Sequence, residues 1–298
     1  MDFDVIIIGG SYAGLSAGLA LGRSMRKVLI IDSGKPCNAQ TPHSHNFLTH
    51  DGDAPSNIAA KAKAEVLKYP TVEFLNDFVI SAKHLENGVL IETENGEKFT
   101  SRKVLISTGL KDVMPDLKGF ADCWAISVIH CPYCHGYEVR DENIGLMMNG
   151  DMAFEMAKNL YHWNKDLTVL TNGISQFNDE QRENLQSKSI NIIEDEILEF
   201  LHHDGLLQKV IFKSGKHLPL KAVYARPEMK QHAKLYIDLN YELNDSGLIV
   251  VNEQYETTVK GIYAAGDCIS PARGLSVVTA SGTMAAVMMN RAMISEDF

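Results

Sequence analysis

The sequence lacks an apolar run long enough to cross a membrane. The longest candidate, residues 5–20, is interrupted by glycines and by Ser11, whereas a spanning helix needs about 20 mostly apolar residues. The basic-then-apolar pattern of a signal peptide is also missing, because Asp2 and Asp4 stand in the first positions. We therefore expect a cytoplasmic protein without a membrane partner.

Positive charge is scarce too. The formal net charge is −10, and a nucleic-acid-binding surface needs a cluster of basic residues, so we expect no nucleic-acid partner. Hydrophobic residues make up 45% and charged residues 22% of the 298 positions, as in ordinary globular proteins. This length has room for two domains or for one large α/β domain.

Cysteine is sparse, with five unevenly spread residues, which excludes the disulfide framework of a small secreted protein. Cys131 and Cys134 form a close pair that indicates metal or redox chemistry. A zinc site would need further ligands at suitable spacing. Cys123, His130 and His135 are available but no second C-x-x-C is present, so we expect no metal. An inert pair of buried thiols is the other alternative.

The sequence contains one order of strands and helices that occurs twice. The first copy runs as a strand, "DVIIIGG", a helix over 13–23, a strand, "KVLIID", and a helix over 55–68. Short strands separated by "ENG" and "NGE" follow, as in an antiparallel meander, and "KVLIST" closes the copy. From residue 142 the same elements recur in order, from "NIGLMMNG" to "KAVYAR".

This repeat predicts an α/β protein with two Rossmann-like dinucleotide-binding domains, each a three-layer ββα arrangement. The apolar, small-residue segment that begins at "GIYAAGDC" would complete the first domain. We expect the first domain over residues 1–112 and 245–298. The second domain, over 113–244, would be inserted in it and would carry the cysteine pair.

The first strand ends in the glycine turn "GGSYAG". Gly9 and Gly14 supply the first and third glycines of a dinucleotide-binding turn, and Ser11 stands in for the second with a hydroxyl that can hydrogen-bond phosphate. Asp32 ends the next strand 23 residues after Gly9, near the spacing of a ribose-binding acid. The plain alternative is a strand–helix turn without a ligand.

Two more segments resolve that choice. "TTVKGIYAAGDC" places Asp267 after a strand and a glycine, and "ASGTMAA" then opens a helix. With "ISTGL" at 106–110, the chain resembles the flavoprotein disulfide reductases with two dinucleotide-binding domains. The resemblance implies FAD, with Asp267 near its ribityl and phosphate groups, Thr108 and Gly109 in the same site, and the helix N-terminus favouring negative charge on the flavin.

The loop "TPHSHNFLTHDG" at 41–52 would run along the flavin by the same resemblance, with Asn46 and His45 as candidate contacts. Metal binding by its histidines is not favoured, because their spacing fits no helix face. We expect FAD to be bound by Gly9, Gly10, Ser11, Ala13, Gly14, Asp32, Ser33, Asn46, Thr108, Gly109, Gly266 and Asp267.

The cysteine pair lies in "VIHCPYCHGYEVR". Two cysteines on adjacent turn positions can close a small disulfide, and a thiolate beside a histidine has a lowered pKa and is a good nucleophile. The string resembles the low-molecular-weight thioredoxin reductases, and "CPYCHGYE" is closest to their dithiol oxidase branch, which acts on gliotoxin-type and holomycin-type metabolites. The resemblance implies that Cys134 lies nearest the flavin and that Cys131 exchanges with substrate.

Where the common thioredoxin reductase pattern has an aspartate after the second cysteine, this chain has His135. A histidine can accept a thiol proton as readily as it donates one, and we expect His135 and His130 to take part in catalysis. The plain alternatives are a polar residue at a helix start for His135 and a structural role for His130.

The second domain does not repeat the glycine pattern. Gly150 and Ala153 are present, but Met148 holds the position of the first glycine, where a side chain obstructs the bend. The segment "TNGISQFN" at 171–178 has no Arg or Lys, whereas the thioredoxin reductases carry a basic cluster there for the 2′-phosphate of NADPH. We expect an NAD(P)-like domain without a working nucleotide site.

Together these features predict an FAD-dependent thiol–disulfide oxidoreductase that exchanges electrons between flavin and a substrate through Cys131 and Cys134. We expect it to work without NADPH and to oxidise dithiols with oxygen as the acceptor. The alternatives are a thioredoxin reductase driven by ferredoxin or another donor, and a flavin-binding redox sensor. The expected partner is a small dithiol or disulfide, or a thioredoxin-like protein, and the resemblance implies a homodimer.

Overall fold

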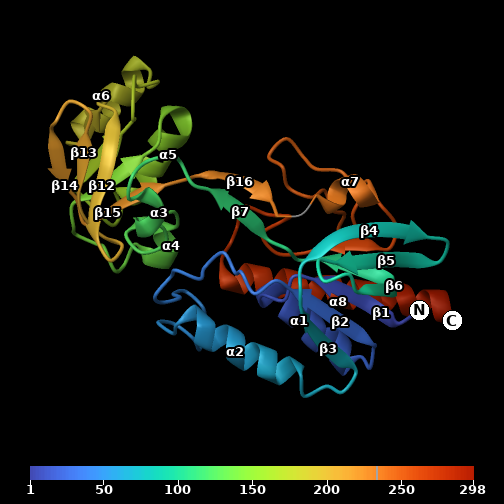
Figure 1. Ribbon diagram of the computed structural model, residues 1–298. Helices are drawn as coiled ribbons and strands as arrows, with labels where there is room; N and C mark the ends of the chain where they lie inside the picture. The colour runs from blue at the N-terminus through green and yellow to red at the C-terminus, as the bar shows by residue number, and fades with distance from the viewer. Residues whose placement is uncertain (233) are drawn as a thin grey trace. The chain divides into compact units, whose positions relative to one another are not determined.

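The computed structural model describes residues 1–232 and 234–298 and contains two compact units (Figure 1). The first unit comprises Met1–Ala39, Asn46–Asp112 and Met229–Phe298, and the second comprises Gln40–His45 and Val113–Glu228. The second unit is thus inserted in the first, as the repeated plan predicted. Among the described residues, no helix has the length and apolarity to span a membrane.

The first unit is built on a parallel sheet of order β3-β2-β1-β6-β17, which continues into an antiparallel meander of β4, β5 and β6. β6 belongs to both parts, because Lys98–Ser101 pairs with β5 and Val104–Ile106 pairs with β17. The strands are β1 (Phe3–Ile8), β2 (Val28–Asp32), β3 (Val72–Asn76), β4 (Val79–Leu85), β5 (Gly88–Thr93), β6 (Lys98–Ile106) and β17 (Ile262–Ala264).

Strand β1 shows why this unit has three layers. Side chains alternate across a strand, so Val5 and Ile7 pack against the helices on one face. Ile6 and Ile8 pack toward the meander on the other face. The helix layer contains α1 (Tyr12–Arg23), α2 (Pro55–Val66) and α8 (Leu275–Asp297), with α1 and α8 side by side in Figure 1. Both faces of the sheet are therefore buried, as expected for parallel strands.

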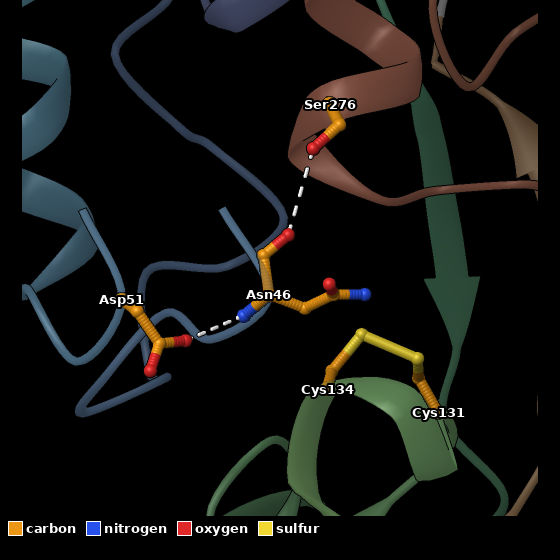
Figure 2. Close-up of a disulfide and its surroundings, with 5 residues drawn as sticks. All are labelled: Asn46, Asp51, Cys131, Cys134 and Ser276. Atoms are coloured by element: carbon orange, nitrogen blue, oxygen red, sulfur yellow. Dashed lines mark hydrogen bonds between the residues drawn. A yellow bond between two sulfur atoms is a disulfide. The ribbon is translucent and has the colours of Figure 1, made fainter. Parts of the chain in front are cut away.

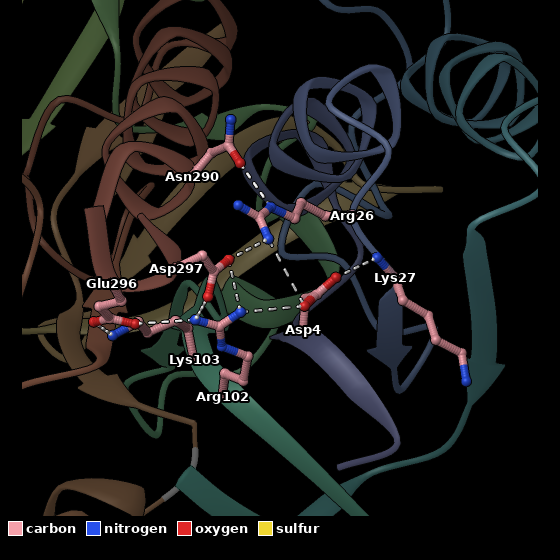
Figure 3. A network of polar contacts seen from close by, with 8 residues as sticks. All are labelled: Asp4, Arg26, Lys27, Arg102, Lys103, Asn290, Glu296 and Asp297. Atoms are coloured by element: carbon pink, nitrogen blue, oxygen red, sulfur yellow. Dashed lines mark hydrogen bonds and ion pairs between the residues drawn. The ribbon is translucent and has the colours of Figure 1, made fainter. Parts of the chain in front are cut away.

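A polar network fastens the last turn of α8 to the sheet (Figure 3). Arg102 Nη2 lies 2.7 Å from Asp297 Oδ1, and Lys103 on the same strand pairs with Glu296. Arg26 Nη1 lies 3.4 Å from Asp297 Oδ2. Isolated surface pairs contribute little, but the shared Asp297 carboxylate links the middle of β6, the C-terminal end of α8 and the turn before β2 in one cluster.

The second unit repeats the plan with a parallel sheet of order β11-β10-β9-β15-β8 and a separate meander of β12, β13 and β14. Its strands are β8 (Val128–Ile129), β9 (Ile144–Met147), β10 (Leu167–Leu170), β11 (Asn191–Ile193), β12 (Ile197–His203), β13 (Leu206–Phe212), β14 (His217–Pro219) and β15 (Ala222–Ala225). Its helices are α3 (Phe120–Cys123), α4 (Pro132–His135), α5 (Gly150–Leu160) and α6 (Asp179–Ser187). The predicted pair of Rossmann-like ββα units is confirmed.

Three features differ from the sequence-based expectations. The chain rejoins the first unit at Met229 rather than at 245, because Leu235 and Leu239 of α7 (Leu235–Leu239) are buried in the same core as Ile6. Helix α8 starts at Leu275, before the segment "ASGTMAA" that was expected to open it. Strands β3, β7 (Leu110–Val113) and β16 (Glu228–Gln231) were not predicted, and the last two pair with each other.

Candidate functional site

The glycine turn after β1 needs glycine at two positions. Gly9 has φ +103°, and a Cβ built on it would lie 2.3 Å from the carbonyl oxygen of Ser107. A Cβ on Gly14 would lie 1.9 Å from the carbonyl oxygen of Gly9. Contacts this short are impossible for a real side chain, so these residues make the tight bend and the close helix–strand approach that a dinucleotide-binding turn requires.

Asp32 holds this turn against the end of β2. Its Oδ2 accepts a hydrogen bond from the Gly10 N–H at 2.6 Å, and its Oδ1 accepts one from the Gly34 N–H at 2.7 Å. Ser11 is the N-cap of α1 and makes no side-chain capping bond. The carboxylate and the hydroxyl are therefore both placed at the start of α1, a helix end that favours anions.

Helix α8 lies close over the same turn. A Cβ on Gly282 would lie 2.1 Å from the carbonyl oxygen of Ala13, and a Cβ on Gly266, at φ +84°, would lie 2.9 Å from the Cβ of Ala13. The Gly266 N–H donates to Ser281 Oγ at 3.0 Å. These contacts bring Ala13 and Gly266, both predicted from the sequence, into one compact arrangement.

Asp267 follows Gly266, and only one of its two carboxylate oxygens has a partner among the described residues. Its Oδ2 lies 3.1 Å from Arg273 Nε, and the side chain is 11% exposed. Burial raises the pKa of this carboxyl above its usual value, and the nearby Arg273 charge acts in the opposite direction. Within residues 1–232 and 234–298, its buried Oδ1 has no hydrogen-bond partner. A buried carboxylate oxygen of this kind is suited to accept a ligand hydroxyl, which fits the ribityl chain of FAD.

A cavity of about 50 Å³ opens beside the turn, lined by Gly9, Ser33, Thr108 and His232, among others. Gly109 follows at φ +67°, with open space where its Cβ would be. Ser33 and Thr108, which line the cavity, and the adjacent Gly109 were predicted from the sequence, whereas His232 was not. No motif marked His232, because it follows β16, whose pairing with β7 is visible only in the fold. Burial lowers the pKa of His232.

Asn46 is fixed in the first unit by two backbone contacts (Figure 2). Its N–H donates to Asp51 Oδ1 at 2.8 Å, and its carbonyl accepts from Ser276 Oγ at 3.5 Å. Its φ of +59° is a left-handed conformation that asparagine tolerates. The preceding His45 belongs to the second unit, where its Nε2 lies 3.6 Å from Glu138 Oε1. The loop candidates Asn46 and His45 thus fall in different units.

Cys131 and Cys134 form a disulfide in the second unit, with their Cα atoms 5.3 Å apart (Figure 2). Cys131 is the N-cap of the short helix α4, and Pro132 takes the first helical position, which proline favours. The N–H groups of Cys134 and His135 both donate to the Cys131 carbonyl at 3.2 Å. The turn therefore places the two sulfur atoms together, and the predicted small disulfide is confirmed.

The two flanking histidines differ in their surroundings. Burial lowers the pKa of His135, the charge of Glu138 raises it, and the charge of His45 lowers it further. The lowered pKa favours the neutral form of His135, which is able to accept a proton. His130 stacks on Trp124, with ring centroids 5.7 Å apart and an interplanar angle of 25°. The position of His130 is fixed by this aromatic contact.

The remaining cysteines are separate from the disulfide. Cys123 and Cys268 are buried, and Cys37 is exposed. Burial raises the pKa of the Cys268 thiol to about 12, which keeps it protonated and unreactive. In the part of the chain that the structure describes, no three His, Cys, Asp or Glu side chains gather to hold a metal ion.

The corresponding turn of the second unit has another backbone path. The positive φ falls at Gly150 (+67°), two residues after Met148, rather than at the position of the first glycine. Asn149 Oδ1 accepts from the N–H groups of Gly150 and Gln176, both at 2.9 Å, and its Nδ2 donates to the Ile174 carbonyl at 2.9 Å. The loop after β10 is thereby fastened to the start of α5.

Arg182, whose side chain contacts this loop, is already paired. Its Nη2 lies 3.1 Å from Glu194 Oε1 and 3.3 Å from the Ser175 carbonyl. The hydrogen bond from Arg182 lowers the pKa of Glu194 and so keeps the pair ionised. A phosphate group would compete with Glu194 for this guanidinium.

Three comparisons match nearly the whole chain. A family model described as pyridine nucleotide-disulphide oxidoreductase matches residues 3–288. The protein named thioredoxin reductase sirT of Leptosphaeria maculans is 31% identical over 99% of this chain and 95% of its own length. The one named thioredoxin reductase aclD of Aspergillus oryzae is 30% identical over 96% and 94%.

Among solved structures, an oxidoreductase from Agrobacterium tumefaciens is 33% identical and has a TM-score of 0.92, with 99% of each chain covered. These matches confirm the expected resemblance to thioredoxin reductase-like flavoproteins.

Proposed function

The chain belongs to the pyridine nucleotide-disulphide oxidoreductase family, and from that premise we propose that it is an FAD-dependent enzyme that oxidises dithiols without NADPH. Membership implies a flavin cofactor, and FAD is the form proposed here. The observation that carries the proposal is the contrast between the two glycine turns. In the first unit, the turn lies beside Asp267, whose Oδ1 has no hydrogen-bond partner among the described residues. In the second unit, Asn149 bonds the turn to the loop after β10.

The first unit offers the groups that FAD needs. The Gly9–Gly14 turn and the start of α1 would hold the pyrophosphate, Asp32 would face the ribose, and Asp267 Oδ1 would accept a ribityl hydroxyl. Ser33, Asn46, Thr108, Gly109 and Gly266 complete the set predicted from the sequence. The chemistry that FAD supplies when bound is two-electron acceptance from the enzyme dithiol and transfer to an acceptor, for which we propose dioxygen with hydrogen peroxide as the product.

The second unit would carry out thiol–disulfide exchange. A substrate thiolate attacks Cys131 Sγ, the Cys131–Cys134 bond breaks, and Cys134 takes up the electron pair as a thiolate. The second substrate thiol then attacks the substrate sulfur of the mixed disulfide and releases Cys131. Substrate has lost two electrons and two protons, and the enzyme holds them as a dithiol. Neutral His135 is the group proposed to accept a substrate proton.

The second nucleotide-type unit is proposed to serve as a scaffold for this disulfide. Binding of NADPH would need a glycine-lined turn and free positive charge at the end of β10. Met148 occupies the first position, Asn149 bonds to the loop, and Arg182 is paired with Glu194. Each of these features opposes pyridine-nucleotide binding.

The direct test is anaerobic mixing of the FAD-loaded protein with dithiothreitol. The proposal expects the visible absorbance of the oxidised flavin to bleach, and expects oxygen to restore it with release of hydrogen peroxide. Cys134→Ser should keep FAD and lose the bleaching. Reduction by ferredoxin with no response to dithiols would favour a thioredoxin reductase with an unusual donor. Bleaching without turnover in air would favour a redox sensor.

The partner, the oligomeric state and the location remain predictions. We propose a small dithiol as substrate rather than a thioredoxin-like protein, a homodimer by resemblance to the family, and a cytoplasmic location. Light scattering on the purified protein measures its mass in solution and tests the homodimer.

A further inference from the structure

Two tyrosines flank the disulfide on the surface of the second unit. Tyr133 lies between the two cysteines of α4 and is 65% exposed, and Tyr137 lies two residues after His135 and is 66% exposed. Single exposed apolar side chains are common on protein surfaces, but two exposed tyrosines beside a disulfide mark a candidate binding surface. Because both tyrosines are within three residues of Cys134, we expect a group bound to them to lie near the disulfide.

The ring of Tyr133 is held in place by a fixed neighbour. It packs edge-to-face on Trp163, with centroids 5.4 Å apart and an interplanar angle of 88°. Trp163 in turn contacts His162 at 5.0 Å and 89°. The turn after α4 lies against the indole, because a Cβ on Gly136 would be 3.3 Å from its ring. Tyr133 is therefore pre-organised, which reduces the entropy that binding would cost.

The ring of Tyr137 is held by a cation–π contact with Arg140. The guanidinium carbon of Arg140 lies 3.9 Å from the ring centroid, and Arg140 Nη1 donates to the Tyr137 carbonyl at 2.6 Å. The guanidinium covers one face of the ring and leaves the opposite face for another group.

We propose that Tyr133 and Tyr137 form a tyrosine platform that binds the ring system of a small, uncharged aromatic dithiol. The inference rests on the proposed function and names the class of its substrate. Ring stacking on the platform would hold the substrate while one of its thiols reaches Cys131 Sγ.

The size and charge of the platform favour a small molecule. A protein partner needs about 800 Å² on each side of a stable interface, and two tyrosines supply only a small part of that. The exposed charges that follow along the chain, Glu138, Asp141 and Glu142, are acidic. Arg140 is the exception, and it is engaged with Tyr137. Anionic ligands are therefore disfavoured, and a neutral ring fits.

The test compares 1,2-benzenedimethanethiol, which carries a ring, with dithiothreitol, which does not, on the FAD-loaded enzyme. Tyr133→Ala should raise the KM for the aromatic dithiol roughly 3- to 10-fold relative to any change in the KM for dithiothreitol, as expected for one lost ring–ring contact. Tyr133→Phe should keep the wild-type ratio. Leu206→Ala, which removes an apolar side chain of 59% exposure from β13, should change neither KM.

A second readout does not depend on turnover. Saturation-transfer NMR with 1,2-benzenedimethanol, which has the ring but no thiols, should show binding to wild type and Tyr133→Phe and a reduced signal with Tyr133→Ala. An equal loss for both dithiols, or equal NMR signals in all variants, would overturn the platform. The platform would also be overturned if Tyr133→Ala raised the KM for a reduced thioredoxin but not the KM for the aromatic dithiol. Failure of both dithiols to bleach wild-type flavin, with the NMR result intact, would count against the proposed function alone.

Discussion

Arg273 donates from Nε to Asp267 Oδ2 at 3.1 Å, while Oδ1 of the same carboxylate has no partner among the residues described. The guanidinium is itself held by Asp112, with Nη1 to Oδ1 at 2.7 Å and Nη2 to Oδ2 at 3.2 Å. All three side chains are at most 11% exposed. Arg273 therefore lowers the pKa of Asp267 against the larger effect of burial, and it fixes the direction of the unpaired oxygen.

Arg273→Ala should weaken FAD binding at least 10-fold and destabilise the first unit. Loss of one partner leaves a buried carboxylate uncompensated, which costs about 3–5 kcal/mol, and Asp267 would then become protonated more readily. FAD fluorescence quenching and thermal unfolding measure the two effects. Arg273→Lys should restore part of the FAD affinity through its charge, and equal affinities in wild type and Arg273→Ala would refute this role.

Gly9→Ala should abolish FAD retention, because its Cβ would lie 2.3 Å from the Ser107 carbonyl oxygen at a φ of +103°. Gly96→Ala is the matched control. Gly96 also has a positive φ, +85°, but open space surrounds its Cβ position, so only backbone strain of about 1 kcal/mol is expected. The ratio of bound flavin to protein after gel filtration separates the two variants. Full flavin content in Gly9→Ala would exclude this turn as the cofactor site.

The rate of flavin reduction by a dithiol should fall as the pH drops through the pKa of His135. Burial lowers that pKa below its usual value of 6.5, so the base is present at neutral pH and is lost only at a more acidic pH. Glu138→Gln should shift this loss to still lower pH, because the Glu138 charge raises the pKa of His135. His45→Gln should shift it upward, because the His45 charge lowers that pKa.

Anaerobic stopped-flow rates across pH 5–8 measure these shifts. His135→Asn should remove the acidic limb. The assignment of His135 as the base would fail if the two neighbouring variants moved the limb in the same direction, or if His135→Asn kept it.

Asn149→Ala should cost about 1 kcal/mol of stability, the typical value of a lost N-cap, because it frees the Gly150 and Gln176 N–H groups. It should not create reduction by NADPH, since Met148 and the Arg182–Glu194 pair remain. Urea unfolding and an anaerobic NADPH titration check the two expectations. NADPH reduction gained by this single change would show that Asn149 alone closes the site.

The sequence was informative where local chemistry decides the structure. Gly9 and Gly14 belong to one strand–helix turn, and Cys131 and Pro132 to one helix start, so their patterns were visible, although the contact that excludes a side chain at Gly9 comes from the distant Ser107. Arg273 and His232 were not predicted, because Asp112, which binds Arg273, and Leu110, which contacts His232, lie more than a hundred residues away along the chain. The capping contacts of Asn149 depend on how the loop after β10 folds back. The return of the chain at Met229 was missed because α7 is short and its two buried leucines have no periodic context.

The most direct test of NADPH-independent dithiol oxidation is one anaerobic experiment on the FAD-loaded protein, in which matched amounts of NADPH and dithiothreitol are added separately and flavin absorbance is followed. If dithiols reduce the flavin without NADPH, dithiothreitol bleaches it completely and NADPH does not bleach it on the same time scale. Rapid bleaching by NADPH would contradict this proposal.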